Sequence, residues 1–327
     1  MTLCIWLTAG SVFAAKWLNP ADDCRCDKTE VSFSNGPVKL AATLLIPESE
    51  TGRKSPAVVF VHGSGSSDRS NAWTGAYADG LARRGIIVLY PDKRGSGKSG
   101  GDWLTSSFLD LSDDAVAGVE FLKKDERVDP DRLGLIGFSQ GGDIVPAAAV
   151  RSDAVKFVID ISGSVVPIFE QIMDEVEMSA EREGLTRKQI EIVNEINRKA
   201  LRAALTGKGG EEYLKALQQA KNGDLKGFKV IENFPDEADP PAAKFIRAIG
   251  NFDPMPYWKK LKIPLLFLYG GEDKNLRVHK SVRLIEENLG SGDYNYSVLL
   301  FNQNGHGVFR QDSLDFIGRW IEDGGAK

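Results

Sequence analysis

Leu133-Gly134-Leu135-Ile136-Gly137-Phe138-Ser139-Gln140-Gly141-Gly142 is the segment from which the organisation of this chain can be inferred. Its apolar first half is typical of a buried strand, and an alanine-rich run, Pro146-Ala147-Ala148-Ala149-Val150, follows it. A strand, a sharp turn and a helix in this order, with a serine at the turn, are the features of a G-x-S-x-G nucleophile elbow. The segment therefore predicts that Ser139 stands at a strand-to-helix turn.

The glycines around Ser139 have a steric reason in such an elbow. A side chain at Gly137 or Gly141 would collide with the neighbouring strand and helix. The turn would also place Ser139 at a helix N-terminus, where backbone N–H groups favour developing negative charge. A five-residue pattern with three fixed positions also occurs by chance as an ordinary glycine-rich turn. The remaining motifs of the chain are needed to distinguish a nucleophile elbow from an ordinary glycine-rich turn.

Strands and helices alternate along most of the remaining chain. Asn35-Gly36, between residues 30–33 and 38–46, predicts a β-hairpin. Continuous apolar runs predict strands that are buried on both faces, at residues 57–61, 86–90, 133–138, 155–161, 263–269 and 296–301. Helical patterns separate or follow them, at residues 72–84, 109–124, 282–289 and 313–321. This alternation implies an α/β fold, with a mostly parallel central sheet and helices on both of its faces.

Residues 166–250 interrupt the alternation, because they contain no strand pattern. Thr186-Arg187-Lys188-Gln189 fits a helix capping box, and apolar residues at helical spacing follow it as far as Ala204. Further helices are predicted at 211–220 and 242–249. The sheet pattern resumes afterwards. We therefore interpret 166–250 as a helical cap inserted into a core made of residues 29–165 and 251–327.

The N-terminus has the character of an export signal. Residues 3–13 are mainly apolar and Val12-Phe13-Ala14-Ala15 offers small residues for cleavage, so residues 1–15 are predicted to be a signal peptide. The run is too short to span a bilayer. No basic residue precedes Lys16, which a mis-assigned start codon would explain. We expect a secreted or periplasmic protein without a membrane span. A short buried or interfacial helix is the alternative for this segment, and a cytoplasmic location is the alternative for the protein.

Residues 16–28 are predicted to be a loosely held tail that carries Cys24 and Cys26. A disulfide across a single intervening residue is geometrically awkward, and two cysteines are too few for a metal site. The net charge of the chain is −5. Nucleic acids and anionic membrane surfaces are therefore not the expected partners, because both select basic surfaces.

A serine nucleophile needs a base, and the chain has three histidines. His306 lies in the glycine-rich loop Asn304-Gly305-His306-Gly307 after the last predicted strand, where α/β sheets place their sites. His62 ends an early strand and is expected to shape the turn after it. His279 lies on a polar helix and is expected to be solvated. His306 is therefore the predicted base.

The base needs an acid that orients it. Gly270-Gly271-Glu272-Asp273 follows a predicted strand, and we choose Asp273, with Glu272 as the second choice. Taken alone this segment would be an acidic turn. The order Ser139, Asp273, His306 is the nucleophile–acid–base order that is typical of a serine elbow in this architecture, and this order favours the functional interpretation.

An oxyanion hole needs two preorganised N–H donors. The backbone N–H of Gln140 is the first candidate. The second is the backbone N–H of Ser64, in the turn after the first buried strand. Gly63 would allow that backbone to approach a substrate closely, so we expect it to contribute to substrate binding.

Gly95-Ser96-Gly97-Lys98-Ser99 ends like a phosphate-binding loop but is not one by its spacing. The G-x-x-x-x-G-K-[ST] pattern requires glycine at position 92, where the chain has Asp92. The segment is instead expected to form a rigid loop beside the site, with Arg94 in an ion pair. The sequence contains no cluster of metal-ligating residues. We therefore expect neither a metal nor a cofactor.

Five motifs make the chain resemble the α/β-hydrolases over roughly residues 30–325. The nearest resemblance is to serine esterases related to dienelactone hydrolases and to the catalytic domain of prolyl-oligopeptidase-type peptidases. That family often has His before the nucleophile and Glu after it, where this chain has Phe138 and Gln140, so Phe138 is expected to contact substrate. The motifs are His62-Gly63-Ser64-Gly65 with Asp68-Arg69, residues 92–99, residues 137–142, Gly270-Gly271-Glu272-Asp273 and Gly305-His306-Gly307.

The resemblance implies an α/β-hydrolase fold and a Ser139–His306–Asp273 triad that cleaves small-molecule carboxylic esters through an acyl-enzyme. Dienelactone hydrolases typically use a cysteine nucleophile, so Ser139 argues against that activity. A small peptidase or aminopeptidase, a thioesterase and a non-catalytic binding protein on the same fold are the alternatives. Residues 166–250 are expected to set the acyl specificity.

Overall fold

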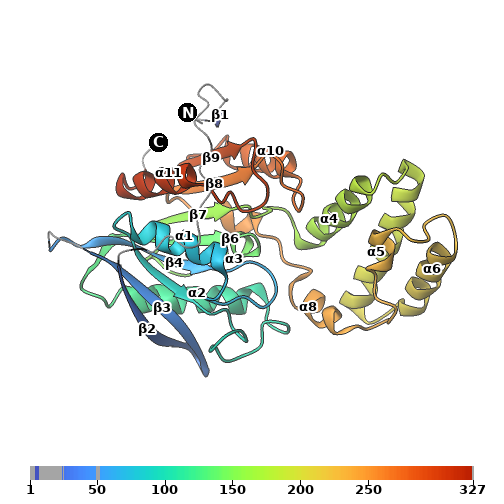
Figure 1. The fold of residues 1–327 in the computed structure, drawn as a ribbon, viewed down its shortest axis with the longest axis horizontal. Coiled ribbons are helices and arrows are strands. Elements are labelled where there is room, and N and C mark those ends of the chain that lie inside the picture. Colours follow the sequence, from blue (N-terminus) through green and yellow to red (C-terminus); the bar gives the residue numbers. More distant parts are fainter. Residues whose placement is uncertain (1–3, 7–23, 25, 49–51, 326–327) are drawn as a thin grey trace.

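The computed structural model describes residues 4–6, 24, 26–48 and 52–325 of the chain. Its strands form one sheet in the order β1-β9-β8-β7-β6-β4-β5-β3-β2 (Figure 1). β3 is antiparallel to β2 and β5, and the other neighbouring pairs are parallel. The predicted mostly parallel sheet is confirmed. The strands are β1 (Cys4–Trp6), β2 (Cys26–Asn35), β3 (Val38–Pro47), β4 (Ser55–Val61), β5 (Ile87–Pro91), β6 (Val128–Phe138), β7 (Phe157–Ile161), β8 (Leu265–Gly270) and β9 (Tyr296–Phe301).

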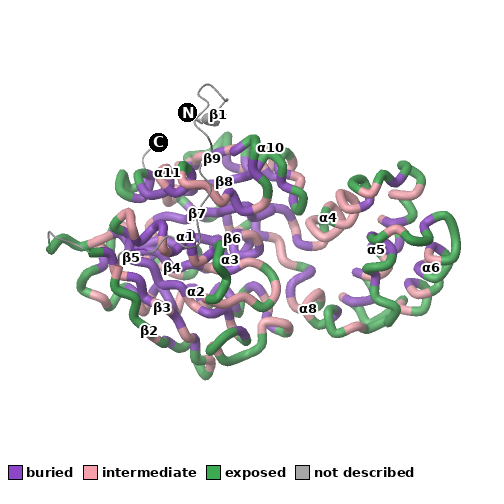
Figure 2. Tube along the Cα trace, viewed as in Figure 1, coloured by how far each residue is buried: buried purple, intermediate pink, exposed green. Residues whose placement is uncertain are grey.

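Helices cover both faces of this sheet, because its central strands are apolar on both sides. Ala57 and Val59 of β4 face one side, together with α2 (Phe108–Leu122), α3 (Gln140–Ala149), α9 (Met255–Trp258) and α10 (Val278–Leu289). Val58 and Phe60 face the other side, together with α1 (Ala72–Ala82) and α11 (Gln311–Glu322). The central strands are buried along most of their length (Figure 2).

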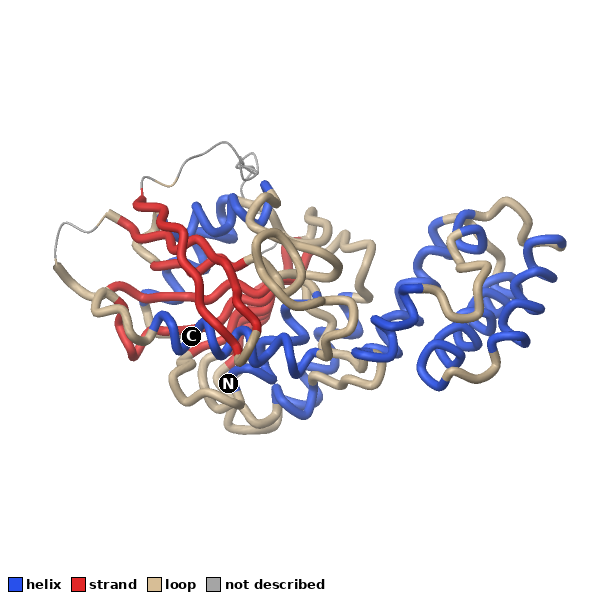
Figure 3. The backbone as a smooth tube through the Cα atoms, turned by 90° about the horizontal axis from the view of Figure 1, so that it is seen from below, coloured by secondary structure: helices blue, strands red, loops and turns tan. Residues whose placement is uncertain are grey.

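Residues 166–250 are helical wherever they are regular, as predicted. They contain α4 (Ile168–Arg182), α5 (Arg187–Thr206), α6 (Gly210–Asn222), α7 (Lys229–Glu232) and α8 (Pro241–Ile249). The capping box predicted at Thr186 and Gln189 is confirmed. α5 and α6 stand apart from the sheet, and α4 and α8 connect them to it (Figure 3). This cap has an apolar core of its own, which includes Val193, Ile196, Leu217 and Ile231.

Ion pairs hold the cap against the N-terminal end of α10. Arg277 and Lys280 of that region face a row of carboxylates on α4. Ile168 of α4 and Ile249 of α8 also pack with Phe108 and Ile144 of the core. The start of α4 and the end of α8 are thereby fixed next to α2 and α3. The carboxylates on α4 are Glu170, Asp174, Glu177 and Glu181.

The N-terminal region differs from the prediction in two respects. β2 begins at Cys26 and pairs with β3 from Cys26 opposite Pro47 onward, so residues 26–28 belong to the sheet rather than to a tail. Cys24 and Cys26 are joined in a disulfide, which the sequence argument disfavoured. Their Cα atoms are 5.2 Å apart, within the range that a disulfide spans.

The predicted signal peptide, residues 1–15, lies mostly outside the described residues. Its described part, Cys4–Trp6, pairs in parallel with Val298–Leu300 at the edge of the sheet. Export therefore stays a prediction. Among the described helices, none combines the length and apolar character that crossing a bilayer requires.

Candidate active site

Ser139 lies between β6 and α3, where its φ is 54° and its ψ is −121°. A positive φ is uncommon for a residue other than glycine and is typical of a strained nucleophile elbow. The N–H of Ser139 donates to the carbonyl of Ile161 at 2.8 Å, which ties the turn to β7. A Cβ atom at Gly137 would collide with the backbone of Gly141, and one at Gly141 with the carbonyl of Val61. The predicted steric reason for the two glycines is confirmed.

His306 and Asp273 form a hydrogen-bonded pair. The Nδ1 atom of His306 lies 2.8 Å from Oδ2 of Asp273, and the Asp273 side chain is 0% exposed. The other carboxylate oxygen, Oδ1, accepts the N–H groups of Asn275 and Leu276 at 2.8 and 3.1 Å. A buried carboxylate oxygen needs such donors, because an unsatisfied buried polar atom is costly. The two N–H groups therefore fix the Asp273 side chain, which in turn orients the imidazole of His306.

The other acid and base candidates lie elsewhere. Glu272 and His279 are exposed. His62 is buried at the end of β4, where its Nε2–H donates to the carbonyl of Pro91 at 2.6 Å and its Nδ1 accepts from the hydroxyl of Ser67 at 3.0 Å. Burial lowers the pKa of His62 to about 4, so the ring is neutral at physiological pH. His62 thus shapes the turn after β4, as the sequence predicted.

Ser139 and His306 line one cavity of about 260 Å³. Ser64 and Gln140, whose N–H groups are the predicted oxyanion donors, line the same cavity. The structure therefore brings together residues from the loops after β4, β6 and β9. The cap supplies the facing wall, which consists of Ile168, Gln171, Ile172 and Glu175 of α4 and Phe245, Ile246 and Ile249 of α8.

The two predicted substrate contacts have different positions. A Cβ atom on Gly63 would come within 3.3 Å of both the Phe138 carbonyl and the Ser139 Cβ, so that backbone does lie against the elbow. Phe138 is 8% exposed and is not among the residues that line the cavity. Its ring packs beneath the His306 loop, 5.3 Å from the Phe309 ring and 6.3 Å from the His306 ring. The contact predicted for Phe138 is corrected to a supporting role under His306.

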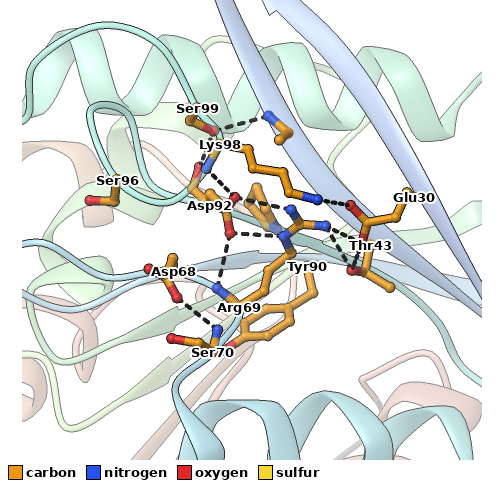
Figure 4. A network of polar contacts seen from close by, with 12 residues as sticks. Glu30, Thr43, Asp68, Arg69, Ser70, Tyr90, Asp92, Ser96, Lys98 and Ser99 are labelled. Atoms are coloured by element: carbon orange, nitrogen blue, oxygen red, sulfur yellow. Dashed lines mark hydrogen bonds and ion pairs between the residues drawn. The ribbon is translucent and has the colours of Figure 1, made fainter.

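Residues 92–99 fold into a hydrogen-bonded loop around Asp92, as expected for a structural segment. The Asp92 carboxylate accepts Nε and Nη2 of Arg69 at 2.8 and 3.0 Å and the N–H of Lys98 at 2.8 Å (Figure 4). The hydroxyl of Ser99 donates to the Asp92 carbonyl. The predicted ion pair of Arg94 is confirmed, with Asp114 as its partner at 2.6 Å. This loop runs from the end of β5 alongside β3.

Loss of Arg69 is expected to destabilise the fold. The Asp92 side chain is 3% exposed, so Arg69→Ala leaves a buried carboxylate without its cation and should lower the free energy of unfolding by about 3 kcal/mol. Lys98→Ala is the matched control, because its side chain is 75% exposed and lies 3.5 Å from Glu30, and it should change the stability by less than about 0.5 kcal/mol. Urea unfolding followed by circular dichroism measures both values. Equal effects of the two substitutions would contradict the importance of the buried pair.

Two charged residues of the site escaped the sequence argument. Lys93 is 7% exposed, and its Nζ donates to Gln140 Oε1 at 2.7 Å and to the Gly63 carbonyl at 2.8 Å. Asp143 is 1% exposed and lines the cavity. Burial raises the pKa of Asp143 to about 7, so this carboxyl is neutral in mildly acidic solution. Lysine and aspartate are ordinarily exposed, and nothing in their sequence neighbourhood signals burial.

Within the described residues, no group of three or more His, Cys, Asp or Glu side chains has the arrangement of a metal site.

Curated relatives of this chain include hydrolases. Esterase EstD of Thermotoga maritima is 28% identical over 256 residues, which are 77% of this chain and 54% of that protein. The quorum-quenching protein AidA of Acinetobacter baumannii is 26% identical over 245 residues, 73% of this chain and 76% of that protein. Dipeptidyl-peptidase 5 of Porphyromonas gingivalis is 29% identical over 122 residues, 36% of this chain and 18% of that protein. The chain thus spans about half the length of esterase EstD and 18% of the length of dipeptidyl-peptidase 5.

Solved structures and a family model agree on the fold. An esterase of Pyrococcus furiosus superposes with a TM-score of 0.60 at 18% identity, over 93% of each chain. Est1E of Butyrivibrio proteoclasticus, solved with ferulic acid, superposes with a TM-score of 0.56 at 20% identity, over 90% of this chain and 96% of that one. The family model described as X-Pro dipeptidyl-peptidase (S15 family) matches residues 35–307. The chain therefore belongs to the X-Pro dipeptidyl-peptidase (S15) family and has the α/β-hydrolase fold.

Proposed function

We propose that this chain is a serine hydrolase that cleaves carboxylic esters through an acyl-enzyme on Ser139. The observation that carries the proposal is one cavity lined by both Ser139 and His306, with Asp273 2.8 Å behind the imidazole. A serine at a positive-φ elbow, a histidine and a buried carboxylate are the parts that acyl transfer requires.

The proposed reaction uses these groups in turn. His306 accepts the hydroxyl proton of Ser139 through Nε2 as Oγ attacks the ester carbonyl. Asp273 accepts the Nδ1–H of His306 and stabilises the imidazolium that forms. The N–H groups of Gln140 and Ser64 bind the oxyanion of the tetrahedral intermediate. His306 then protonates the departing alcohol, and a water molecule activated by His306 releases the acid from Ser139.

Covalent labelling tests the proposal directly. A fluorophosphonate probe reacts with activated serines, so the wild-type chain should become labelled at Ser139, which peptide mass spectrometry identifies. An unlabelled chain, or a label on another serine, would contradict the assignment and favour a non-catalytic binding protein.

A peptidase is the second candidate, and the family match favours it because the family description is that of a dipeptidyl-peptidase. A matched pair of chromogenic substrates separates the two. We expect kcat/KM for p-nitrophenyl butyrate to exceed that for glycyl-proline p-nitroanilide. The reverse order would identify the chain as a peptidase, with the same three residues in the same roles.

The charges of the cavity favour uncharged acyl groups. Asp143 and Glu175 are the acidic residues in its lining, and none of the described lining residues is Lys or Arg. The remaining wall is mainly apolar, from Phe108 and the cap helices. A negative charge on the acyl group would approach these two carboxyl groups, and no Lys or Arg among the described lining residues offsets them at the cavity wall.

Charge repulsion from Glu175 is therefore expected to limit turnover of anionic esters. The p-nitrophenyl half-ester of succinate should have a lower kcat/KM than the butyrate ester, and Glu175→Gln should raise it by about 3- to 10-fold. Glu191→Gln, the same change on an exposed residue of α5 outside this cavity, should leave both substrates unaffected. An increase for the butyrate ester equal to that for the half-ester would argue against a charge effect.

A further inference from the structure

Lys93 lies directly behind the two predicted oxyanion donors. It follows β5 in sequence and is 7% exposed. Its Nζ donates to the carbonyl of Gly63, in the loop after β4, at 2.8 Å and to Oε1 of Gln140, in the first turn of α3, at 2.7 Å. One ammonium therefore joins two segments that are far apart in the sequence.

Among the residues that the structure describes, Lys93 forms no ion pair with a group of opposite charge. Among the described residues, no carboxylate lies within 4.0 Å of the Lys93 Nζ. The ring of Trp103 lies with its centroid 5.8 Å from Nζ and also contacts Phe245 of the cap. Burying an unpaired cation is costly. The burial of Lys93 therefore points to a role other than stability, and its two acceptors indicate what that role is.

We propose that Lys93 is a positioning residue that holds both N–H donors of the oxyanion hole in place and adds positive charge behind them. The carbonyl of Gly63 and the N–H of Ser64 belong to the same peptide unit, and this unit is planar. A hydrogen bond to the carbonyl therefore fixes the direction of the Ser64 N–H. The bond to the Gln140 side chain fixes the residue that carries the second N–H.

The positive charge of Lys93 also favours binding of the oxyanion, in addition to the positioning of the two N–H donors. A cation on the Gly63 carbonyl polarises the peptide unit, which makes its N–H a stronger donor. The benefit is largest when the substrate oxygen carries a full negative charge, in the tetrahedral intermediate and the transition state before it. Lys93 should therefore affect kcat rather than substrate binding. The inference rests on the proposed serine mechanism.

The ionisation of Lys93 should also appear in the pH dependence of kcat. Burial lowers the pKa of Lys93 to about 7, so its charge is lost as the pH rises from 6 to 8. The titratable groups on the surrounding elements are His62, Asp92, Arg94 and Asp143. His62 is neutral in this range, Asp92 is bound to Arg69 and Arg94 to Asp114. Asp143 gains a negative charge as the pH rises, so it too would titrate in this range.

The test compares Lys93→Met with Lys98→Met, an exposed lysine five residues later. Lys93→Met should lower kcat for short p-nitrophenyl esters on the order of 100-fold, with KM within about threefold of the wild-type value, as for the loss of an oxyanion-hole donor. A short alkyl boronic acid, which forms a tetrahedral adduct on a catalytic serine, should lose affinity by a similar factor. Lys98→Met should match the wild type in both measurements.

The pH profile distinguishes positioning from general structural damage. The kcat of the wild type should include a decline as the pH rises through about 7, the pKa of Lys93, and Lys93→Met should lack that decline. An alkaline decline that persists in the variant belongs to Asp143 or another group, and it overturns the electrostatic part of the proposal.

A variant that fails to fold does not end the test. Gln140→Met removes the side-chain amide and with it the Oε1 acceptor, leaves the backbone N–H of Gln140 in place and should lower kcat about 10-fold. If Lys93→Met folds, it should lower kcat by about 10-fold in the Gln140→Met background rather than 100-fold, since the contact with Gln140 is already lost there and only the contact with the Gly63 carbonyl remains to be removed. If Lys93→Met folds and has the wild-type kcat, the proposal is overturned. If Lys93→Met does not fold, a wild-type kcat of Gln140→Met overturns it instead. In both cases the proposed function stands as long as the fluorophosphonate probe labels Ser139. A wild type that is neither labelled nor active overturns both.

Discussion

Ser139→Ala should abolish turnover while the fold is retained. Removal of the nucleophile of a serine triad typically lowers kcat on the order of 10⁴- to 10⁶-fold, because only the binding groups and the oxyanion donors remain. The loss should appear in kcat for p-nitrophenyl butyrate, with KM little changed. The backbone contacts of the elbow, from Ser139 N–H to the Ile161 carbonyl and from Gly142 N–H to the Ser139 carbonyl, do not involve the hydroxyl.

The control for this substitution is another serine-to-alanine change. Ser291 is exposed after α10, and Ser291→Ala should retain wild-type kcat. Circular dichroism and thermal unfolding should give the same secondary structure and a similar Tm for both variants. If Ser139→Ala kept more than a tenth of the wild-type kcat, Ser139 would not be the nucleophile and the esterase proposal would fail.

The sheet and the elbow could be predicted from sequence because their signals are local. Strands buried on both faces are continuous apolar runs, and the Asn35-Gly36 hairpin and the capping box at Thr186 are short patterns with a direct physical reason. Gly137 and Gly141 are a local signal of the same kind, because each lies two residues from Ser139. Each of these features depends on residues within a few positions of one another, so no knowledge of the tertiary structure was needed.

The features that the sequence argument missed depend on distant contacts. α4 was not predicted individually, although Ile168, Ile172 and Val176 have helical spacing. Phe138 was expected at the substrate, but its ring packs against Phe309, which lies in the last loop of the site. The burial of Lys93 arises from loops after three different strands and has no signature in its own neighbourhood. Such positions become visible only when the topology is known.

The disulfide between Cys24 and Cys26 is a different kind of failure. Bridges over one intervening residue are disfavoured as a general geometric tendency. The two Cα atoms are nevertheless 5.2 Å apart at the start of β2. The general tendency therefore does not hold for this backbone segment. Its conformation is constrained from Cys26 onward by the pairing of β2 with β3.

Asp273→Asn should lower kcat about 10⁴-fold, because the asparagine NH₂ group donates to Nδ1 of His306 where the carboxylate accepts from it, and this fixes the wrong tautomer of the imidazole. The asparagine oxygen can still accept the N–H groups of Asn275 and Leu276, which bind Oδ1 of Asp273. The turn after β8 should therefore survive. The new NH₂ group would take the place of Oδ2, 2.8 Å from Nδ1 of His306. It can only donate to that nitrogen, which moves the imidazole proton to Nε2 and leaves His306 unable to accept a proton from Ser139.

Glu272→Gln is the matched control for Asp273→Asn, since it removes the neighbouring carboxylate by the same change. Glu272 is exposed, and its N–H donates to the Asn304 carbonyl at 2.8 Å, a backbone contact that the substitution keeps. We therefore expect kcat within about twofold of the wild type. The pair of variants also separates the two acids that the sequence left open. If Glu272→Gln were the inactive variant and Asp273→Asn the active one, Glu272 would be the acid, and the buried hydrogen bond between Asp273 and His306 would serve the fold instead.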